Sequence, residues 1–316
     1  MPAVAEHRQP VGTGFALRDP LPWSDLSGVV RAAEQTGYLA LFLPEISGRD
    51  ALVTLGALAG ETRDLLLVTG IAPIASRTTL LTAMASATVQ ERSGGRLILG
   101  LGTGGIGPGA LDRLREEVRA LRALFAGEIV ERRGERMRLS LDPGPGPPIW
   151  ISALGPRAMR LAGEIADGAL LNWCPPRRVA FARAAVAEAA EAAGRDPAGV
   201  TVSVYVRAWV GEDEATAMPA LKAAAGQYAS YPAYARQFEQ VGLGEEAAAA
   251  AAAHRAGRAE DVPERLVRAV CAIGPDARAR IEAYRDAGAG LPVVYPVAVG
   301  GAEASIEGTL SALAPT

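Results

Sequence analysis

The chain has 316 residues, of which 49 % are hydrophobic and 21 % charged, a composition that predicts a folded protein with a substantial core. Its 32 basic and 35 acidic residues are interspersed and leave a net charge of -3, which argues against nucleic acid and acidic membranes as partners. Neither a signal segment nor a membrane-spanning run is recognisable, so a cytoplasmic location is expected.

Apolar strands and amphipathic helices alternate along the first half of the chain. Strands are expected at 11–17, 39–43, 65–71, 97–101, 149–153 and 169–171. Helices are expected at 24–37, where Ser24 would be the cap, and at 50–61, 78–90, 110–125 and 157–166. The polar segment 128–141, with Gly134 at its centre, predicts a hairpin outside the core.

The second half continues the alternation with one interruption. A helix at 179–193 and a strand at 200–210 are followed by an Ala-rich stretch, about 213–256, that predicts inserted helices. Helices at 263–270 and 276–288, a strand from Leu291 and a helix from Ala302 follow. Eight strands, apolar without alternation, are typical of parallel strands covered by helices. The expected fold is a (β/α)8 TIM barrel, a single domain over 1–316 with a helical insertion before the last strand.

Glycine stands at the carboxyl ends of two strands in the segment 65–105, where α/β proteins bind ligands. Gly102-x-Gly104-x-x-Gly107 also satisfies the dinucleotide fingerprint. A Rossmann domain carries that loop after its first strand, however, and here it follows the fourth. The glycines therefore favour a tight turn that lets the backbone approach a planar or phosphorylated ligand.

A second strand ends at Ala153-Leu154-Gly155, where the N–H groups of a helix start are available to an anion. Arg177 and Arg178 come shortly after Asn172, which ends the next strand. Arginines in such places are commonly solvated surface charges, but beyond a strand's carboxyl end they become candidates for clamping phosphate.

Acid–base groups are scarce, because the only histidines are His7, near the terminus, and His254, in the insertion. Proton transfer would have to use carboxylates, tyrosine or water. Glu45, at the end of the second strand, is the best candidate for a catalytic carboxylate, followed by Asp19. Glu45 could equally cap a helix or pair with Arg49.

No zinc, calcium or P-loop pattern is present, so no metal is predicted. Cys174 and Cys271 lie far apart and have no paired spacing, which argues against a disulfide framework. We expect both to be small buried or half-buried thiols.

Three segments together resemble one family: TGIAPIASR (69–77), ERSGGRLILGLGTG (91–104) and PIWISALGPRAMRLAGEIADG (148–168). AGAGLPVVYPV (287–297) is similar to that family's last strand. The family is that of the bacterial-luciferase-like, flavin- or deazaflavin-dependent oxidoreductases. The resemblance implies that the carboxyl-end face of the barrel holds the isoalloxazine or deazaflavin ring.

In the branch that uses coenzyme F420, the third strand bends at a bulge, often with a non-prolyl cis peptide, that supports the ring. Thr69, Gly70 and Ile71 correspond to it, with Gly70–Ile71 as the candidate cis bond, a conformation that costs about 3 kcal/mol. The resemblance also implies cofactor contacts from Gly102, Thr103, Gly104, Ala153, Leu154 and Gly155, with Asn172, Arg177 and Arg178 near the cofactor's tail.

Family members that oxidise alcohols carry Asp-His after the second strand and Glu in the glycine loop. Here those places hold Glu45-Ile46 and Gly105, so reduction of a C=N or activated C=C bond, as in the methylene-tetrahydromethanopterin reductase type, fits better than alcohol oxidation. The expected activity is F420-dependent hydride transfer to or from a small organic substrate, with Glu45 positioning substrate or relaying a proton, in a homodimer. The alternatives are an FMN-dependent monooxygenase and a non-catalytic flavin-binding paralogue.

Overall fold

A closed ring of eight parallel strands forms the centre of the molecule, as seen in a computed structural model that describes residues 10–18, 21–105, 107–132, 134–142 and 144–315. In ring order the strands are β1 (Gly14–Ala16), β2 (Ala40–Leu43), β3 (Leu66–Thr69), β5 (Leu97–Gly102), β8 (Ile149–Ser152), β9 (Gly168–Asn172), β10 (Thr201–Trp209) and β12 (Leu291–Pro296). The pairing of β12 with both β10 and β1 closes the ring.

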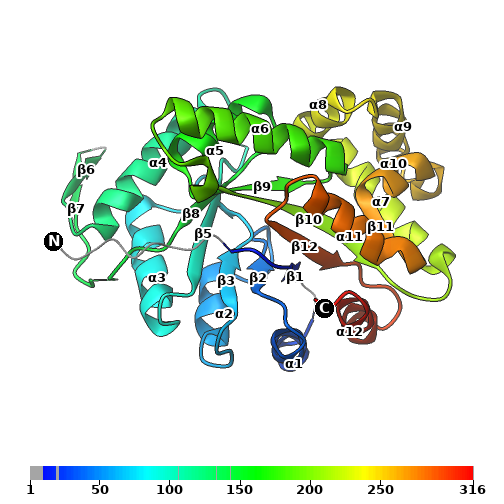
Figure 1. Cartoon of the computed structure of the whole chain (residues 1–316), viewed down its shortest axis with the longest axis horizontal. Coiled ribbons are helices and arrows are strands. Elements are labelled where there is room, and N and C mark those ends of the chain that lie inside the picture. Colours follow the sequence, from blue (N-terminus) through cyan, green and yellow to red (C-terminus); the bar gives the residue numbers. More distant parts are fainter. Residues whose placement is uncertain (1–9, 19–20, 106, 133, 143, 316) are drawn as a thin grey trace.

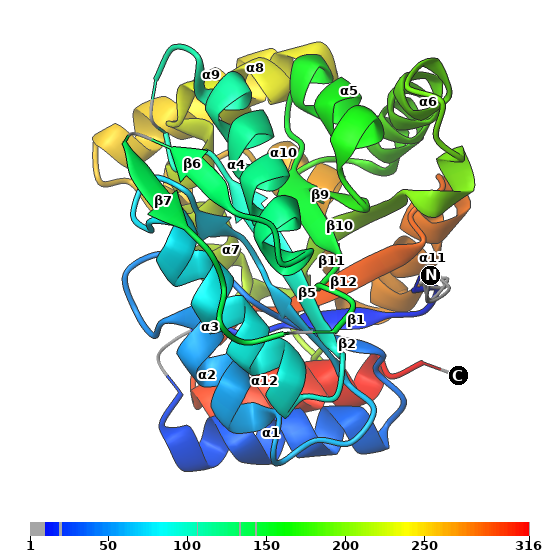
Figure 2. The same ribbon diagram turned by 90° about the vertical axis from the view of Figure 1, so that its left-hand side faces the viewer.

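Helices surround the barrel on its outside (Figures 1 and 2). They are α1 (Trp23–Gln35), α2 (Ala51–Leu58), α3 (Thr79–Arg92), α4 (Ala110–Phe125), α5 (Pro156–Ile165), α6 (Pro176–Ala192), α10 (Glu264–Val270), α11 (Ala277–Asp286) and α12 (Ala302–Ala312). The predicted (β/α)8 barrel is confirmed. The Rossmann alternative is wrong, because the glycine loop follows a strand inside a closed barrel.

Large side chains fill the barrel's interior instead of a channel. Phe42, Trp150 and Tyr205 project inward from β2, β8 and β10, with ring centroids 6.1 Å (Phe42–Trp150) and 5.8 Å (Phe42–Tyr205) apart. Each such ring contributes about 1.5–3 kcal/mol through burial. All nine residues of β10 are buried, since one face meets this interior and the other the helices.

The insertion consists of α7 (Met218–Ala229), α8 (Pro232–Gln240) and α9 (Gly244–Arg255), at the right of Figure 1. It follows β10 and precedes the last barrel strand, as predicted. Its apolar residues form a cluster with Trp173 and Trp209, which come from the ends of β9 and β10. The insertion is therefore attached at the carboxyl ends of these strands.

Several boundaries differ from the expectation. The first strand is only three residues long, and Val11 is exposed. Helix α1 begins at Trp23 after Pro22, so Ser24 lies inside the first turn and is not the cap. The strand β11 (Cys271–Ile273), which pairs with the end of β10, was not predicted, because three residues are too few for a periodic pattern.

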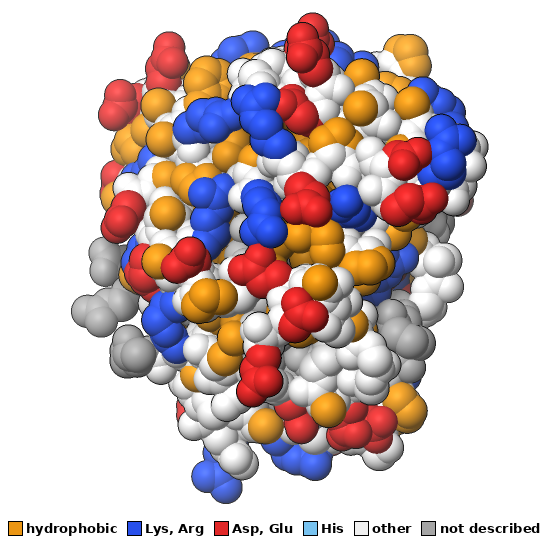
Figure 3. Space-filling model, turned by 90° about the vertical axis from the view of Figure 1, so that its right-hand side faces the viewer, with side chains coloured by type: hydrophobic (Ala, Val, Ile, Leu, Met, Phe, Trp, Pro, Cys, Tyr) orange, Lys and Arg blue, Asp and Glu red, His pale blue; other side chains and the backbone are white. Residues whose placement is uncertain are grey.

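The predicted hairpin is formed by β6 (Val130–Arg132) and β7 (Glu135–Met137), antiparallel and outside the barrel. On the side of the molecule seen in Figure 3, acidic and basic side chains are mixed with hydrophobic ones, in keeping with the interspersed charges of the sequence. Within the described ranges, the helices are too short or too polar to cross a membrane.

Glu34 and Arg96 tie together the turns that precede β3 and β5. One carboxylate oxygen of Glu34 accepts the backbone N–H groups of Arg63, Asp64 and Leu65 at 2.8–2.9 Å. The Arg96 guanidinium donates to backbone carbonyls, including that of Leu65 at 2.9 Å. These contacts lie at the amino ends of the strands, where barrels concentrate stability and not catalysis.

Replacing Glu34 by Gln should lower the free energy of unfolding at pH 7 by roughly 1 kcal/mol, because the charge-assisted bonds weaken. Partial burial raises the pKa of Glu34, but the N–H groups of Asp64, Leu65 and Arg63 lower it more, to a net value below the ordinary 4.5. The carboxylate therefore stabilises the fold above pH 4.5, and this contribution is lost as the pH falls through the folded-state pKa. Urea unfolding at several pH values should show that the difference in free energy of unfolding between the two proteins becomes smaller below about pH 4. A difference that does not depend on pH would contradict this.

Candidate functional site

The third barrel strand bends immediately after Thr69. Strand β3 pairs with β5 up to Val68 and Ile98, and the chain pairs with β5 again as β4 (Ala72–Pro73), where Ala72 lies opposite Leu101. The chain thus advances four positions on one strand while the partner advances three. One extra residue is accommodated, so the predicted bulge is present.

Ile71 takes up the strain of this bend, with a φ of 147° that β-branched residues rarely adopt. The only other non-glycine residue with positive φ among the described residues is Trp173, after β9. The expected cis bond between Gly70 and Ile71 is wrong, since the described chain has no cis peptide bond. The extra residue and the positive φ produce the bend with a trans peptide. Strained backbone of this kind clusters at functional sites.

Hydrogen bonds to β5, β2 and β10 hold the bulge in place. The Thr69 hydroxyl donates to the Gly100 carbonyl (2.9 Å) and accepts the Gly100 N–H (2.7 Å). The Gly70 N–H donates to the carbonyl of Leu43 (2.7 Å), and the Tyr205 hydroxyl donates to the Gly70 carbonyl (3.0 Å). A Cβ atom on Gly70 would lie 2.0 Å from the Tyr205 hydroxyl oxygen, so this contact requires glycine.

A cavity of about 260 Å³ opens beside the bulge, at the carboxyl ends of the strands. This volume lies just below the usual range for ligand sites, about 300–1,000 Å³. Of the residues singled out from the sequence, it is lined by Glu45, Gly70, Ile71, Gly102, Thr103, Gly104, Leu154 and Asn172. The sequence analysis missed other lining residues, among them Ser152, Tyr205, Arg207, Tyr228, Tyr234 and Tyr295.

The remaining predicted residues lie behind or beside the cavity. Thr69 and Ala153 are fully buried, and Gly155 precedes the first turn of α5. The buried Arg178 donates to the carbonyl of Leu154 at 2.8 Å, and Arg177 donates to the carbonyl of Val241. The two arginines thus fasten a strand end and the insertion, and neither lines this cavity.

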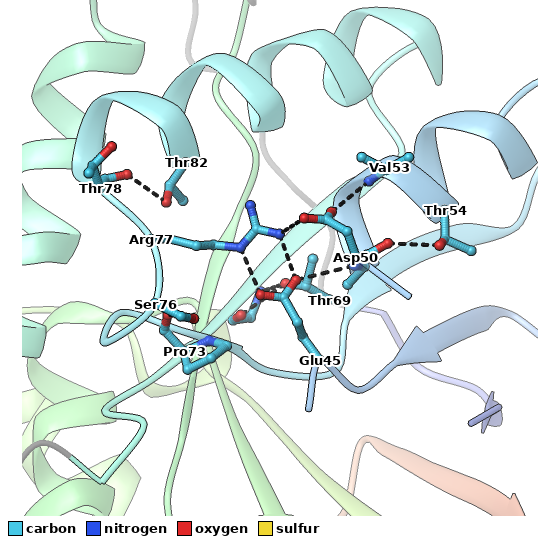
Figure 4. Close-up of polar contacts among 12 residues, drawn as sticks. Glu45, Asp50, Val53, Thr54, Thr69, Pro73, Ser76, Arg77, Thr78 and Thr82 are labelled. Atoms are coloured by element: carbon cyan, nitrogen blue, oxygen red, sulfur yellow. Dashed lines mark hydrogen bonds and ion pairs between the residues drawn. The ribbon is translucent and has the colours of Figure 1, made fainter. Parts of the chain in front are cut away.

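Glu45 is held by Arg77 at the rim of the cavity (Figure 4). Arg77 Nε donates to Glu45 Oε1 at 2.8 Å and Nη2 to Oε2 at 2.7 Å, while the Ala51 N–H donates to Oε2 at 3.2 Å. Arg77 also contacts Asp50, and the hydrogen bonding of Arg77 to Glu45 is the largest cause of the raised pKa of Arg77. Glu45 therefore caps α2 and pairs with an arginine, which is Arg77 and not Arg49.

Two of the cavity's tyrosines keep their protons at neutral pH. Burial raises the pKa of Tyr205 and of Tyr234 above the ordinary value of 10. The Tyr234 hydroxyl accepts a hydrogen bond from Asn172 Nδ2 at 2.8 Å. Such hydroxyls can donate hydrogen bonds, but the raised pKa makes them weak acids, and they are poor bases because they stay protonated. His254 is exposed on α9 and does not line the cavity, and His7 and Asp19 lie outside the described residues.

Both thiols are buried, as predicted, and burial raises the pKa of Cys174 and of Cys271 to about 12. They are therefore poor nucleophiles. A search of the described residues finds no group of three or more His, Cys, Asp or Glu side chains that could hold a metal ion.

A larger groove of about 710 Å³ lies between α3, α4 and the hairpin, and it begins directly after the bulge at Ile74. Two of its charged side chains are engaged with each other: Arg132 pairs with Glu117, which accepts a hydrogen bond from Thr79 at 2.9 Å. The smaller cavity combines the strained bulge with the strand ends, so we take it as the candidate active site.

Comparison with known proteins gives a consistent result. The profile of a family described as "Luciferase-like monooxygenase" matches residues 4–290. The 5,10-methylenetetrahydromethanopterin reductase of Methanolobus tindarius is 33 % identical over 66 % of this chain and 68 % of that enzyme. An F420-dependent hydroxymycolic acid dehydrogenase of Mycobacterium tuberculosis is 33 % identical over 53 % of this chain, which spans about half (51 %) of that protein. The coenzyme F420-dependent tetrahydromethanopterin reductase of Methanopyrus kandleri superposes with a TM-score of 0.78, at 22 % identity over 95 % of this chain and 97 % of that one.

Replacing Gly70 by Ala should destabilise the protein by about 1–3 kcal/mol, because the added methyl group overlaps the Tyr205 hydroxyl. The variant carrying Tyr205→Phe as well should recover part of the loss, since the overlapping hydroxyl is gone while the Cβ still lies 3.1 Å from backbone atoms of Leu43 and Pro44. Urea unfolding of both single variants and the double variant measures this coupling. Gly155→Ala is the matched control, because nothing lies within 4 Å of its added Cβ. If the stability loss of the double variant equals the sum of the losses of the two single variants, the proposed contact is contradicted.

Proposed function

The chain belongs to the luciferase-like family, and we propose on that premise that it is a coenzyme F420-dependent oxidoreductase that moves a hydride between the deazaflavin and a small organic substrate. The observation that carries the proposal is the strained bulge at Gly70–Ile71, which borders the cavity at the carboxyl ends of the barrel strands. The relatives named for F420 support the choice of cofactor.

The residues around the cavity fit a planar heterocycle. Its wall at the bulge is backbone and the Ile71 side chain, and four tyrosines also line it, whose rings contact flat ligands well. Gly102, Thr103 and Gly104 add backbone to the same wall. When bound, the deazaflavin would supply or accept the hydride. The protein's own part is to orient the two reactants and exclude water.

Reduction of a C=N or activated C=C bond suits the acid–base groups better than alcohol oxidation. Alcohol oxidation needs a base for the hydroxyl proton, and Glu45, the carboxylate that lines the cavity, is already bound at both oxygens. Reduction by hydride needs no such base, and the protonated Tyr234 hydroxyl can donate a hydrogen bond to the acceptor. In this proposal Glu45 positions the substrate through a remaining lone pair.

A homodimer remains part of the proposal. Val53 on α2 and Leu81 and Met84 on α3 are large apolar side chains that are more than half exposed. Exposed apolar groups that gather on neighbouring helices are a common mark of a subunit interface.

A second candidate is an FMN-dependent monooxygenase, which the family's description as luciferase-like monooxygenases favours. We expect fluorescence titration of the purified protein to give at least about tenfold tighter binding of F420 than of FMN, since the site would be built for the deazaflavin. Reduced F420 should then be oxidised anaerobically by an iminium or enone acceptor, followed by absorbance in a stopped-flow instrument.

Three other outcomes would each contradict this. Tighter FMN binding with consumption of oxygen would favour the monooxygenase. Binding of F420 without turnover of any acceptor would favour a non-catalytic paralogue. Faster turnover with oxidised F420 and a secondary alcohol would reverse the expected reaction type.

Glu45→Gln should raise KM about tenfold and change kcat less, because a positioning contact acts on ground state and transition state alike. Steady-state kinetics from pH 5 to 9 with the best acceptor provide the measurement. Asp50→Asn, which alters the same ion-pair cluster outside the cavity lining, serves as the control. An acid limb of kcat that disappears in Glu45→Gln would show instead that this carboxylate transfers a proton.

A further inference from the structure

Arg207 brings a positive charge to the cavity wall without an acidic partner. The residue is buried, at 7 % exposure, and lines the cavity from β10. Its guanidinium makes one protein hydrogen bond, from Nη1 to Asn172 Oδ1 at 2.6 Å, and it forms no ion pair within the described ranges of the chain. Because a guanidinium carries five N–H donors, most of its hydrogen-bonding capacity is unused.

Aromatic rings surround this guanidinium. Its central carbon lies 4.1 Å from the ring centroid of Tyr295, 4.8 Å from that of Trp173, 5.5 Å from that of Tyr228 and 5.6 Å from that of Tyr205. Ring faces attract a cation, and they restrict the directions in which the guanidinium can move. They accept few hydrogen bonds, so the cage orients the charge without neutralising it.

Arg96, which ties two turns together, is bonded differently. Arg96 donates to the carbonyls of Ser93, Ala59, Thr62 and Leu65 and so has backbone acceptors on several sides. A buried cation without such acceptors, or a counter-ion, is costly for folding. The arrangement at Arg207 therefore indicates a group whose partner is a ligand.

The position of Arg207 on β10 determines how far its charge lies from the bulge. Tyr205 and Arg207 are two residues apart on β10, so their side chains lie on the same face, roughly 7 Å apart along the strand. Tyr205 contacts the Gly70 carbonyl, and Arg207 lies one repeat closer to the strand's carboxyl end. An anion bound at Arg207 would lie within a small molecule's length of a ring resting on the bulge.

We infer that Arg207 binds the carboxylate of the substrate, so that the enzyme acts on small organic acids whose reducible bond lies a few atoms from that group. A planar carboxylate matches the guanidinium fork at two points. Asn172, Tyr228 and Tyr234 complete the surroundings of the bound acid, the tyrosines coming from the insertion. The inference rests on the proposed function, and the same anionic chemistry could come from the cofactor's own tail.

The test uses the full-length protein without cofactor and the probe pair benzoate and benzamide, which have nearly the same shape but differ in charge. Calorimetric titration should give at least about tenfold tighter binding of benzoate. Arg207→Met should abolish this preference, and Arg207→Lys, which keeps the charge but not the fork, should retain part of it. Arg255→Met, on the exposed surface of α9, should leave the preference unchanged.

Thermal unfolding adds a readout that separates binding from packing. If Arg207 serves a ligand, Arg207→Met should leave the melting temperature unchanged or raise it, because an unpaired buried charge is removed. A large fall in melting temperature, or no preference for benzoate in the unaltered protein, would overturn the inference.

F420 and its tail-less deazaflavin analogue distinguish the two sources of the anion. We expect Arg207→Met to leave the affinity for both within threefold of the unaltered protein's. Weakened binding of F420 alone would assign the anion to the cofactor tail and overturn the inference. If F420 does not bind at all, the proposed function fails, while the benzoate preference still reports on Arg207.

Discussion

The contact between Tyr205 and Gly70 is the constraint on which the site depends. The tyrosine hydroxyl reaches across the barrel to the carbonyl of a residue that cannot carry a Cβ atom, and that residue begins the bulge. The hydrogen bonds of Thr69 to Gly100 fasten the other side of the same bend. The strained backbone of Ile71 is thus maintained by packing between β3, β5 and β10, and the cavity inherits its shape from the barrel core.

Two arginines bring positive charge to the cavity, one paired with carboxylates and the other without a carboxylate partner. At the rim, Arg77 is neutralised by Glu45 and Asp50, and the cluster joins the end of β2 to the start of α3. On the inner wall, Arg207 has aromatic neighbours and an amide instead of carboxylates. Compensated charge near the rim holds the loops in place, while uncompensated charge inside remains available to a ligand.

Much of the barrel could be predicted, because apolar strands buried on both faces and helices with one apolar side leave recognisable patterns in the sequence. The cavity lining was predictable where glycine marks close approach of backbone, as at Gly70 and Gly102, and where Glu45 and Asn172 end strands. Arg207 could have been found as the lone charge in the run VSVYVRAWV, at the inward register of Tyr205. Tyr228 and Tyr234 could not, since no local pattern tells how an inserted helix folds back over a barrel.

The attachment of the insertion has a consequence for how such a protein diversifies. Its helices pack largely on one another and on Trp173 and Trp209, yet they contribute Tyr228 and Tyr234 to the cavity. The bulge and most of the cavity lining belong to the barrel, whereas Tyr228 and Tyr234 are carried by a separable segment. Exchange of that segment between related chains could therefore alter substrate preference while the chemistry at the bulge is inherited intact, which makes α7–α9 a natural unit for recombination.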